Sequence, residues 1–154
     1  MIKINVLITD KKWKKYINNP ELYLKKKIRK LQSKHDYFEK KNFELTVLLS
    51  GEEEIKKLNK KFRNKNKVTD ILSFPFYEKK QLFTFFKNRQ TCYLGDININ
   101  IYKIIKNANN QKFIELFDKL WIHGLLHLLG YKHRLNKDYI KMQRFEKKIF
   151  NSIN

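Results

Sequence analysis

Cysteine is almost missing from this sequence, because Cys92 is the only one among 154 residues. The chain therefore cannot form an internal disulfide. A single thiol also excludes a cysteine-based zinc site, since such sites use several thiolate ligands. The lack of disulfides suits a reducing compartment, and we expect a cytoplasmic protein.

Long apolar runs are missing as well. No stretch approaches the roughly 20 apolar residues needed to cross a bilayer, and residues 1–10 lack the architecture of a signal peptide. We therefore expect no membrane partner and a whole chain kept inside the cell. Hydrophobic residues still make up 42% of the sequence, which is typical of a globular protein. The length predicts one domain over residues 1–154.

Acidic residues are scarce: 15 Asp and Glu stand against 35 Lys and Arg, for a formal charge of +20. Such a charge favours a polyanionic partner, with nucleic acid first and an anionic membrane surface second. A second interpretation is a compositional bias toward Lys, Asn and Ile, which raises the Lys content without any partner. Charge alone leaves both interpretations open.

Apolar periodicity and turn residues predict the secondary structure. Strands are expected at Ile2–Ile8, 43–49, 70–76 and 92–99, with the last one interrupted at Gly95 and Asp96. Helices are expected at 20–37, 101–108, 113–129 and 138–150, with another capped by Ser50 and a short one at 11–17. Residues 77–90 are interpreted as a basic connection, such as a hairpin excursion. The pattern predicts an α+β fold with a mixed sheet of about four strands and about five helices.

Three of the four histidines lie within eleven residues: His123, His127 and His133. His123 and His127 are four residues apart, so they project from one helix face. Gly130 can adopt the left-handed conformation that ends the helix and lets the chain bring His133 back. Three imidazoles at a helix C-terminal end, with a fourth position left for water, predict a catalytic zinc site. Zinc would acidify that water and polarise a phosphoryl or carbonyl oxygen.

Two alternatives accompany this interpretation. The histidines can be ordinary packed residues, and nickel or copper also accept imidazole ligands. The pattern H-x-x-x-H-x-x-G-x-x-H also occurs in metzincin metalloproteases, which carry a glutamate base directly after the first histidine. Here that position is Gly124, so peptidase activity of that type is not expected unless the base comes from elsewhere.

The histidine segment closely resembles the signature of the YbeY family. Residues 123–133 read HGLLHLLGYKH, and the family signature is H-G-x-L-H-L-x-G-Y-D-H. Further segments match in order: residues 58–63 (LNKKFR), followed by residues 69–75 (TDILSFP), and then residues 94–97 (LGDI). Lys132 replaces the usual Asp of the signature, and Phe62 replaces a Tyr. An aspartate at position 132 could orient an imidazole, so its loss can weaken metal binding without removing a ligand.

The resemblance implies a zinc-dependent endoribonuclease specific for single strands. It implies late processing of small-subunit ribosomal RNA, including 3′ end maturation, and ribosome quality control, with the small ribosomal subunit as partner. His123, His127 and His133 would hold one Zn²⁺, and Arg63 and His123 would be catalytic. Arg63 would bind a phosphate, because a guanidinium forks onto phosphate oxygens; the alternative is a surface cation at a helix end. The other candidate functions are a non-catalytic assembly factor with a structural metal and a zinc peptidase.

Several further residues are weaker candidates. Asp70 and Asp96 could act as a base or orient a ligand, but we favour turn or capping roles; Ser73 could line a cleft or be a buried hydroxyl. Basic residues could track an RNA backbone with aromatic rings among them, as single-stranded RNA prefers. These are residues 25–34 with Lys79, Lys80, Lys87 and Arg89, interleaved with Phe83, Phe85, Phe86 and Tyr93. A solvated face with core aromatics is an equally good interpretation.

The sequence also leaves open whether water or the 2′-hydroxyl of the RNA is the nucleophile.

Overall fold

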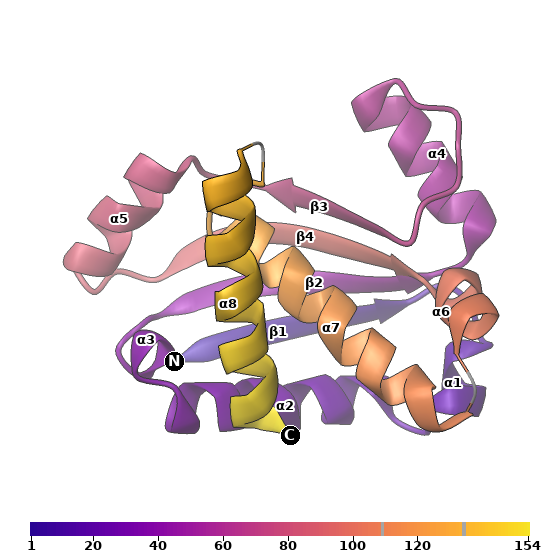
Figure 1. Ribbon diagram of the computed structural model, residues 1–154, viewed down its shortest axis with the longest axis horizontal. Coiled ribbons are helices and arrows are strands. Elements are labelled where there is room, and N and C mark those ends of the chain that lie inside the picture. Colours follow the sequence, from indigo (N-terminus) through magenta and orange to yellow (C-terminus); the bar gives the residue numbers. More distant parts are fainter. Residues whose placement is uncertain (109, 134) are drawn as a thin grey trace.

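A mixed sheet of four strands forms the centre of the computed structural model, which describes residues 1–108, 110–133 and 135–154 (Figure 1). The strands are β1 (Ile2–Ile8), β2 (Phe43–Ser50), β3 (Ile71–Pro75) and β4 (Cys92–Asn100), in the order β1-β2-β4-β3. The first three in this order run parallel, and the edge strand β3 is antiparallel to β4. The expected α+β class and mixed sheet are confirmed.

Eight helices surround the sheet in the described part of the chain, where about five were expected. They are α1 (Trp13–Tyr16), α2 (Pro20–Lys34), α3 (Asp36–Glu39), α4 (Glu52–Arg63), α5 (Lys79–Lys87), α6 (Ile101–Asn107), α7 (Asn110–Leu128) and α8 (Asn136–Ile153). The excess arises partly because the helix expected over 20–37 breaks at His35. This residue adopts an extended backbone, and its ring caps the start of α3 by accepting a hydrogen bond from the N–H of Tyr37.

The interpretation of residues 77–90 as a connection or hairpin was wrong, because they contain α5. Glu78 and Gln81 form a capping box at its start, with the Glu78 N–H donating to Gln81 Oε1 at 2.9 Å. Leu82 is buried, and Phe85 and Phe86 pack against the core at helical spacing from it. The many aromatic side chains suggested strand, but burial of one helical face decided the structure.

Ser50 does not cap the following helix. It is the last residue of β2 and fully buried, and its hydroxyl donates to Asn98 Oδ1 at 2.5 Å. Gly51 takes the N-cap position of α4 without a side-chain cap. The backbone oxygen of Ser50 also accepts a hydrogen bond from the indole of Trp13 at 3.0 Å, which ties α1 to the sheet.

Strand β4 is continuous, and the expected interruption is a β-bulge. Tyr93 pairs with Glu44 and Asp96 pairs with Thr46, so the two residues Leu94 and Gly95 face a single residue of β2. Gly95 has a φ of +130°, and a Cβ there would lie 2.1 Å from the backbone oxygen of Phe74. Only glycine fits this point, where β4 passes the edge strand β3.

Helix α7 is the element that positions the histidines against the sheet. It packs on β3 and β4, while α2 packs on β1, and α8 crosses both α2 and α7 (Figure 1). Its buried residues Phe117, Trp121 and Leu125 anchor it in the core. None of the helices within the described residues has the length and apolar character that a bilayer span requires.

Candidate metal centre

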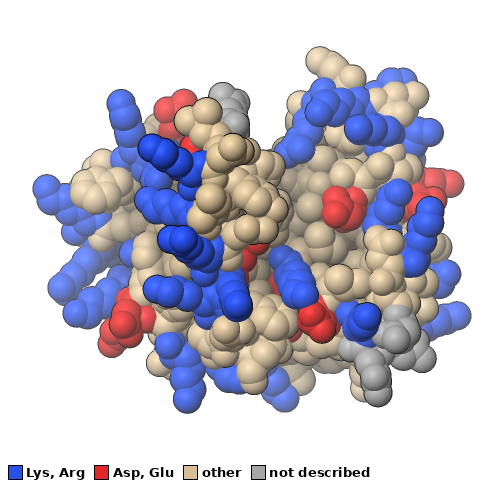
Figure 2. Space-filling view, in the orientation of Figure 1, with Lys and Arg blue, Asp and Glu red and all other residues tan. Residues whose placement is uncertain are grey.

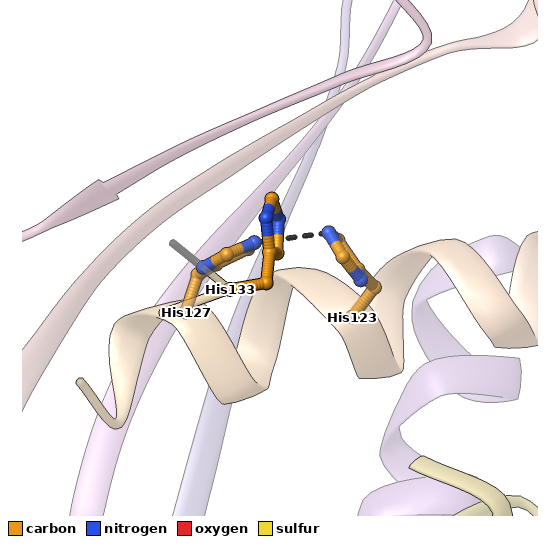
Figure 3. A group of neighbouring side chains, drawn as sticks. All are labelled: His123, His127 and His133. Atoms are coloured by element: carbon orange, nitrogen blue, oxygen red, sulfur yellow. Dashed lines mark hydrogen bonds between the residues drawn. The ribbon is translucent and has the colours of Figure 1, made fainter. Parts of the chain in front are cut away.

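The C-terminal end of α7 carries the first two histidines one turn apart on one face. The N–H of Gly130 donates to the backbone oxygen of His127 at 3.0 Å, and the N–H of Tyr131 donates to that of Leu126 at 3.0 Å. With a φ of +83° at Gly130, these two bonds form the Schellman motif that ends helices. The chain then turns back and brings His133 beside the other two rings, as the sequence predicted (Figure 3).

The three imidazoles converge closely. One ring nitrogen of each histidine lies within 4.8 Å of the other two. The ring centroids of His123 and His127 are 4.5 Å apart, and those of His127 and His133 are 5.0 Å apart. His123 and His127 are half-buried, whereas His133 is exposed. The group could therefore hold a metal ion on a side that solvent reaches.

Contacts outside the cluster fix two of the rings. Nδ1 of His123 lies 2.6 Å from Oε1 of Glu146 on α8, and Nδ1 of His127 lies 2.9 Å from the backbone oxygen of Tyr131. A carboxylate and a carbonyl accept hydrogen bonds, so each Nδ1 faces an acceptor and each Nε2 points into the cluster, where the two Nε2 atoms lie 2.9 Å apart. Ligating histidines in metal sites usually have such an outer partner. The donor set therefore fits a metal that prefers imidazole.

The pKa of His127 also favours a neutral ligand. Burial lowers it to about 4, and the neighbouring His123 and His133 act in the same direction. The carbonyl of Tyr131 acts against this lowering but does not cancel it. A metal binds only the neutral imidazole, so little proton competition remains at this ring near neutral pH.

Glu146 was missed in the sequence analysis. It is one of two acidic residues in the otherwise basic helix α8, the other being Asp138, and it follows the buried Met142 by one helical turn. This spacing from a buried residue was the signal in the sequence that Glu146 faces the interior side of α8. Lys132, at the position where the resembling signature has an aspartate, is exposed, so the carboxylate of this centre comes from α8.

Packing explains the glycine that follows the first histidine. A Cβ at Gly124 would lie 2.9 Å from Cγ2 of Ile97 and 3.0 Å from Cδ1 of Ile71. Helix α7 thus touches the sheet at this residue, and a glutamate there would have no room. The base position of the metzincin proteases is therefore closed off by the sheet itself.

Arg63 lies at the end of α4, away from direct contact with the histidines. Its Nη2 donates to the backbone oxygen of Ser73 at 3.1 Å, and its guanidinium carbon lies 6.0 Å from the ring centroid of Phe74. Both partners belong to β3, the strand on which α7 packs. Figure 2 shows a hollow between α4 and the upper end of α8, with Lys and Arg side chains on its α4 rim.

The remaining sequence candidates have local partners. Asp70 accepts hydrogen bonds from the N–H of Ile71 and the hydroxyl of Thr69, and Asp96 accepts one from Tyr93 at 2.6 Å. Ser73 is buried, and its backbone oxygen holds Arg63. None of these contacts joins the three residues to the histidine cluster.

A family model and curated relatives agree on one family. The family model described as Endoribonuclease YbeY matches residues 7–154. A curated Endoribonuclease YbeY of Pelagibacter ubique is 42% identical over 156 residues, covering 99% of this chain and 97% of the relative. Another, of a Wolbachia strain, is 33% identical over 158 residues, covering 99% and 95%. The solution structure of a Thermotoga maritima protein matches with a TM-score of 0.56 at 26% identity, covering 99% of this chain and 89% of that one.

Proposed function

This chain belongs to the endoribonuclease YbeY family, and from that premise we propose that it cuts single-stranded RNA with one zinc ion held by His123, His127 and His133. The convergence of three imidazoles on a solvent-accessible side is the observation that carries the proposal. Three imidazoles with one position left open are a donor set typical of catalytic zinc. The bound ion would polarise a phosphoryl oxygen and acidify a water molecule.

The residues around the cluster would keep it ready for the ion. Glu146 and the carbonyl of Tyr131 hold the rings of His123 and His127, so their Nε2 atoms already face one point. Such preorganisation lowers the cost of binding, because the rings need little reorientation. His123 would thereby serve the reaction as a ligand that Glu146 fixes from α8.

Arg63 is proposed to bind a phosphate of the substrate. A guanidinium has five N–H donors, and the bond to Ser73 uses one of them while the residue stays exposed. Anchored on β3, it would neutralise charge that grows on the phosphate during the reaction.

Replacing Arg63 tests this role. In Arg63→Ala we expect kcat for RNA cleavage to fall by about 100-fold, because one preorganised donor to the reacting phosphate is lost. Zinc content should stay at the wild-type level. Lys14→Ala, which removes an exposed cation on α1, is the matched control. Cleavage by Arg63→Ala at the wild-type rate would leave Arg63 as a surface cation.

The physiological substrate is proposed to be small-subunit ribosomal RNA, cut late in its maturation at the 3′ end, with the small ribosomal subunit as partner in the cytoplasm. The family membership and the charge of +20 support this assignment. The products identify the nucleophile: a 2′,3′-cyclic phosphate shows attack by the 2′-hydroxyl, whereas attack by water forms no such end.

Metal removal combined with a choice of substrates tests the proposed function. Purified protein is incubated with single-stranded RNA, double-stranded RNA and casein, with and without a chelator and with zinc added back. We expect cutting of single-stranded RNA alone, lost on chelation and restored by zinc. Cleavage of casein alone would instead identify a peptidase. Protein that binds ribosomal subunits without cutting any substrate would be an assembly factor.

A further inference from the structure

A pocket of about 370 Å³ lies between α5 and the turn that follows α7. Its wall combines aromatic rings with lysines: Tyr37, Phe83, Tyr131, Lys41, Lys79 and Lys87. None of the described residues that line it is acidic. Its volume falls within the usual range of ligand pockets, about 300–1,000 Å³. Figure 2 shows Lys and Arg side chains gathered on the left of the molecule, where Figure 1 places α5.

Tyr131 joins this pocket to the metal centre. Its backbone oxygen contacts Nδ1 of His127 at 2.9 Å, and its ring lies in the pocket wall, 5.2 Å from Nζ of Lys79. The connection is tight, since a Cβ added at Gly130 would come within 2.8 Å of Cβ of Lys79. An RNA strand with one phosphate at the histidines can therefore place a neighbouring nucleotide in this pocket.

The side chains of α5 divide into two groups, which resolves the alternatives left open by the sequence. Leu82, Phe85 and Phe86 pack inward against the core. Phe83 points outward and is 68% exposed, a large apolar surface for a residue beside so many charges. Lys87, on the same helix, is also exposed. The aromatics are thus both core and surface, and Phe83 is the most exposed of those on α5.

Rings and cations in this arrangement match one class of ligand. Lys41 lies 3.9 Å from the ring centroid of Tyr37, so an ammonium already sits against an aromatic face in this pocket. Proteins bind single-stranded nucleic acid by stacking bases on aromatic rings while cations follow the phosphates. A pocket without carboxylates suits a polyanion, and an exposed phenylalanine suits a base.

We propose that this pocket binds a nucleotide of single-stranded RNA next to the phosphate that is cut. Phe83 stacks on the base, and Lys79 and Lys87 contact the backbone phosphates. The inference rests on the proposed function, because that function supplies the RNA. The RNA would then contact the protein in two regions beside the histidines. One is the pocket next to Tyr131, and the other is the region proposed at Arg63.

Binding measurements on the zinc-loaded protein test the pocket. The probe is a fluorescent single-stranded 2′-O-methyl phosphorothioate RNA of about 12 nucleotides, within the site sizes known for such proteins. We expect Phe83→Ala to weaken binding about tenfold, since one stacked base is lost. We expect Lys87→Ala to reduce the slope of log affinity against log salt by about 0.7, the value for one phosphate contact with a single strand.

Two matched controls lie on other helices: Tyr102→Ala on α6, a partly exposed aromatic, and Lys14→Ala on α1, an exposed lysine. Both should bind the probe like the wild type. A probe of the same backbone without bases should not distinguish Phe83→Ala from the wild type; an equal loss with that probe would overturn base stacking.

The outcomes separate this inference from the proposed function. Wild-type protein that cuts RNA, together with Phe83 and Lys87 variants that bind normally, would refute the pocket and leave the nuclease intact. Wild-type protein that neither binds nor cuts RNA would refute both. A tenfold loss in Phe83→Ala, absent from the Tyr102 control and from the base-free probe, supports the pocket.

Discussion

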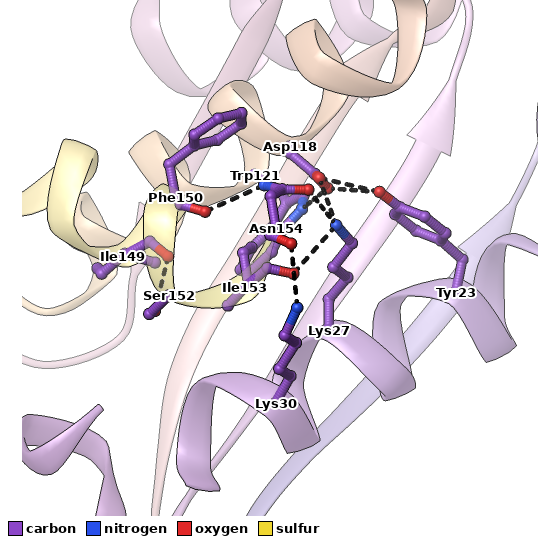
Figure 4. Close-up of polar contacts among 10 residues, drawn as sticks. All are labelled: Tyr23, Lys27, Lys30, Asp118, Trp121, Ile149, Phe150, Ser152, Ile153 and Asn154. Atoms are coloured by element: carbon purple, nitrogen blue, oxygen red, sulfur yellow. Dashed lines mark hydrogen bonds and ion pairs between the residues drawn. The ribbon is translucent and has the colours of Figure 1, made fainter. Parts of the chain in front are cut away.

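Asp118→Ala is expected to lower the free energy of unfolding by about 3–5 kcal/mol, the usual effect of removing one partner from a buried charged pair. Asp118 is fully buried on α7. Its carboxylate accepts hydrogen bonds from Tyr23 at 2.9 Å and from the indole of Trp121 at 2.8 Å, and it pairs with Lys27 at 2.9 Å (Figure 4). The substitution leaves all three groups without this acceptor.

This cluster also connects three helices, of which α7 and α8 carry residues of the metal centre. Tyr23 and Lys27 come from α2, and Lys27 further donates to Asn154 after α8 (Figure 4). Burial, with the neighbouring Asp118, raises the pKa of Tyr23 above its ordinary value, so the hydroxyl stays a donor. Lys27 therefore belongs to the interior, although the sequence analysis counted it within a basic stretch available to RNA.

Urea unfolding followed by circular dichroism measures the effect. Glu115→Ala is the matched control, because Glu115 lies on the same helix and forms an exposed pair with Lys119. Its unfolding midpoint should stay close to that of the wild type. If the two variants unfolded at the same denaturant concentration, the buried cluster would have no special part in the stability of this fold.

The second large effect concerns His127. In His127→Ala we expect zinc affinity to fall by more than about 100-fold, beyond the range typical of changes outside the ligand set. RNA cleavage should fall to background, since two imidazoles cannot hold the ion in the same position. Zinc titration with a competing chelator and a gel-based cleavage assay measure the two quantities.

His35→Ala is the control for this variant. His35 is the fourth histidine and lies at the junction of α2 and α3, where its ring contacts Phe38 and Phe145. Its replacement should leave zinc affinity unchanged. The zinc affinity of Glu146→Gln should lie between those of His35→Ala and His127→Ala, about 10–100-fold below the wild type. Wild-type affinity in His127→Ala would show that the ion binds elsewhere.

The sequence predicted what depends on local spacing. The four-residue interval between His123 and His127, and the glycine that ends α7, follow from helix geometry and need no tertiary information. The strands followed from alternation in the same way. Helix α5 was missed because its aromatic residues favour strand locally, and only packing of Leu82 and its neighbours against the core shows the helix.

The rest of the site depends on contacts between distant segments. Glu146 reaches His123 only because α8 packs across α7, 23 residues later in the chain. The partner of Arg63 is a backbone oxygen of the edge strand, which no residue pattern reveals. The pocket beside Tyr131 likewise joins α5, the turn that follows α7, and residues before β2. Single-sequence patterns indicate the ligands of a site more readily than the residues that support them.

The central claim is that three imidazoles hold one zinc ion and leave one position open. X-ray absorption at the zinc edge of the wild-type protein tests it most directly. The account predicts one zinc per chain with three nitrogen neighbours at about 2.0–2.1 Å and one oxygen neighbour from solvent. A sulfur neighbour, two or fewer imidazoles, or protein that takes up no zinc would contradict it.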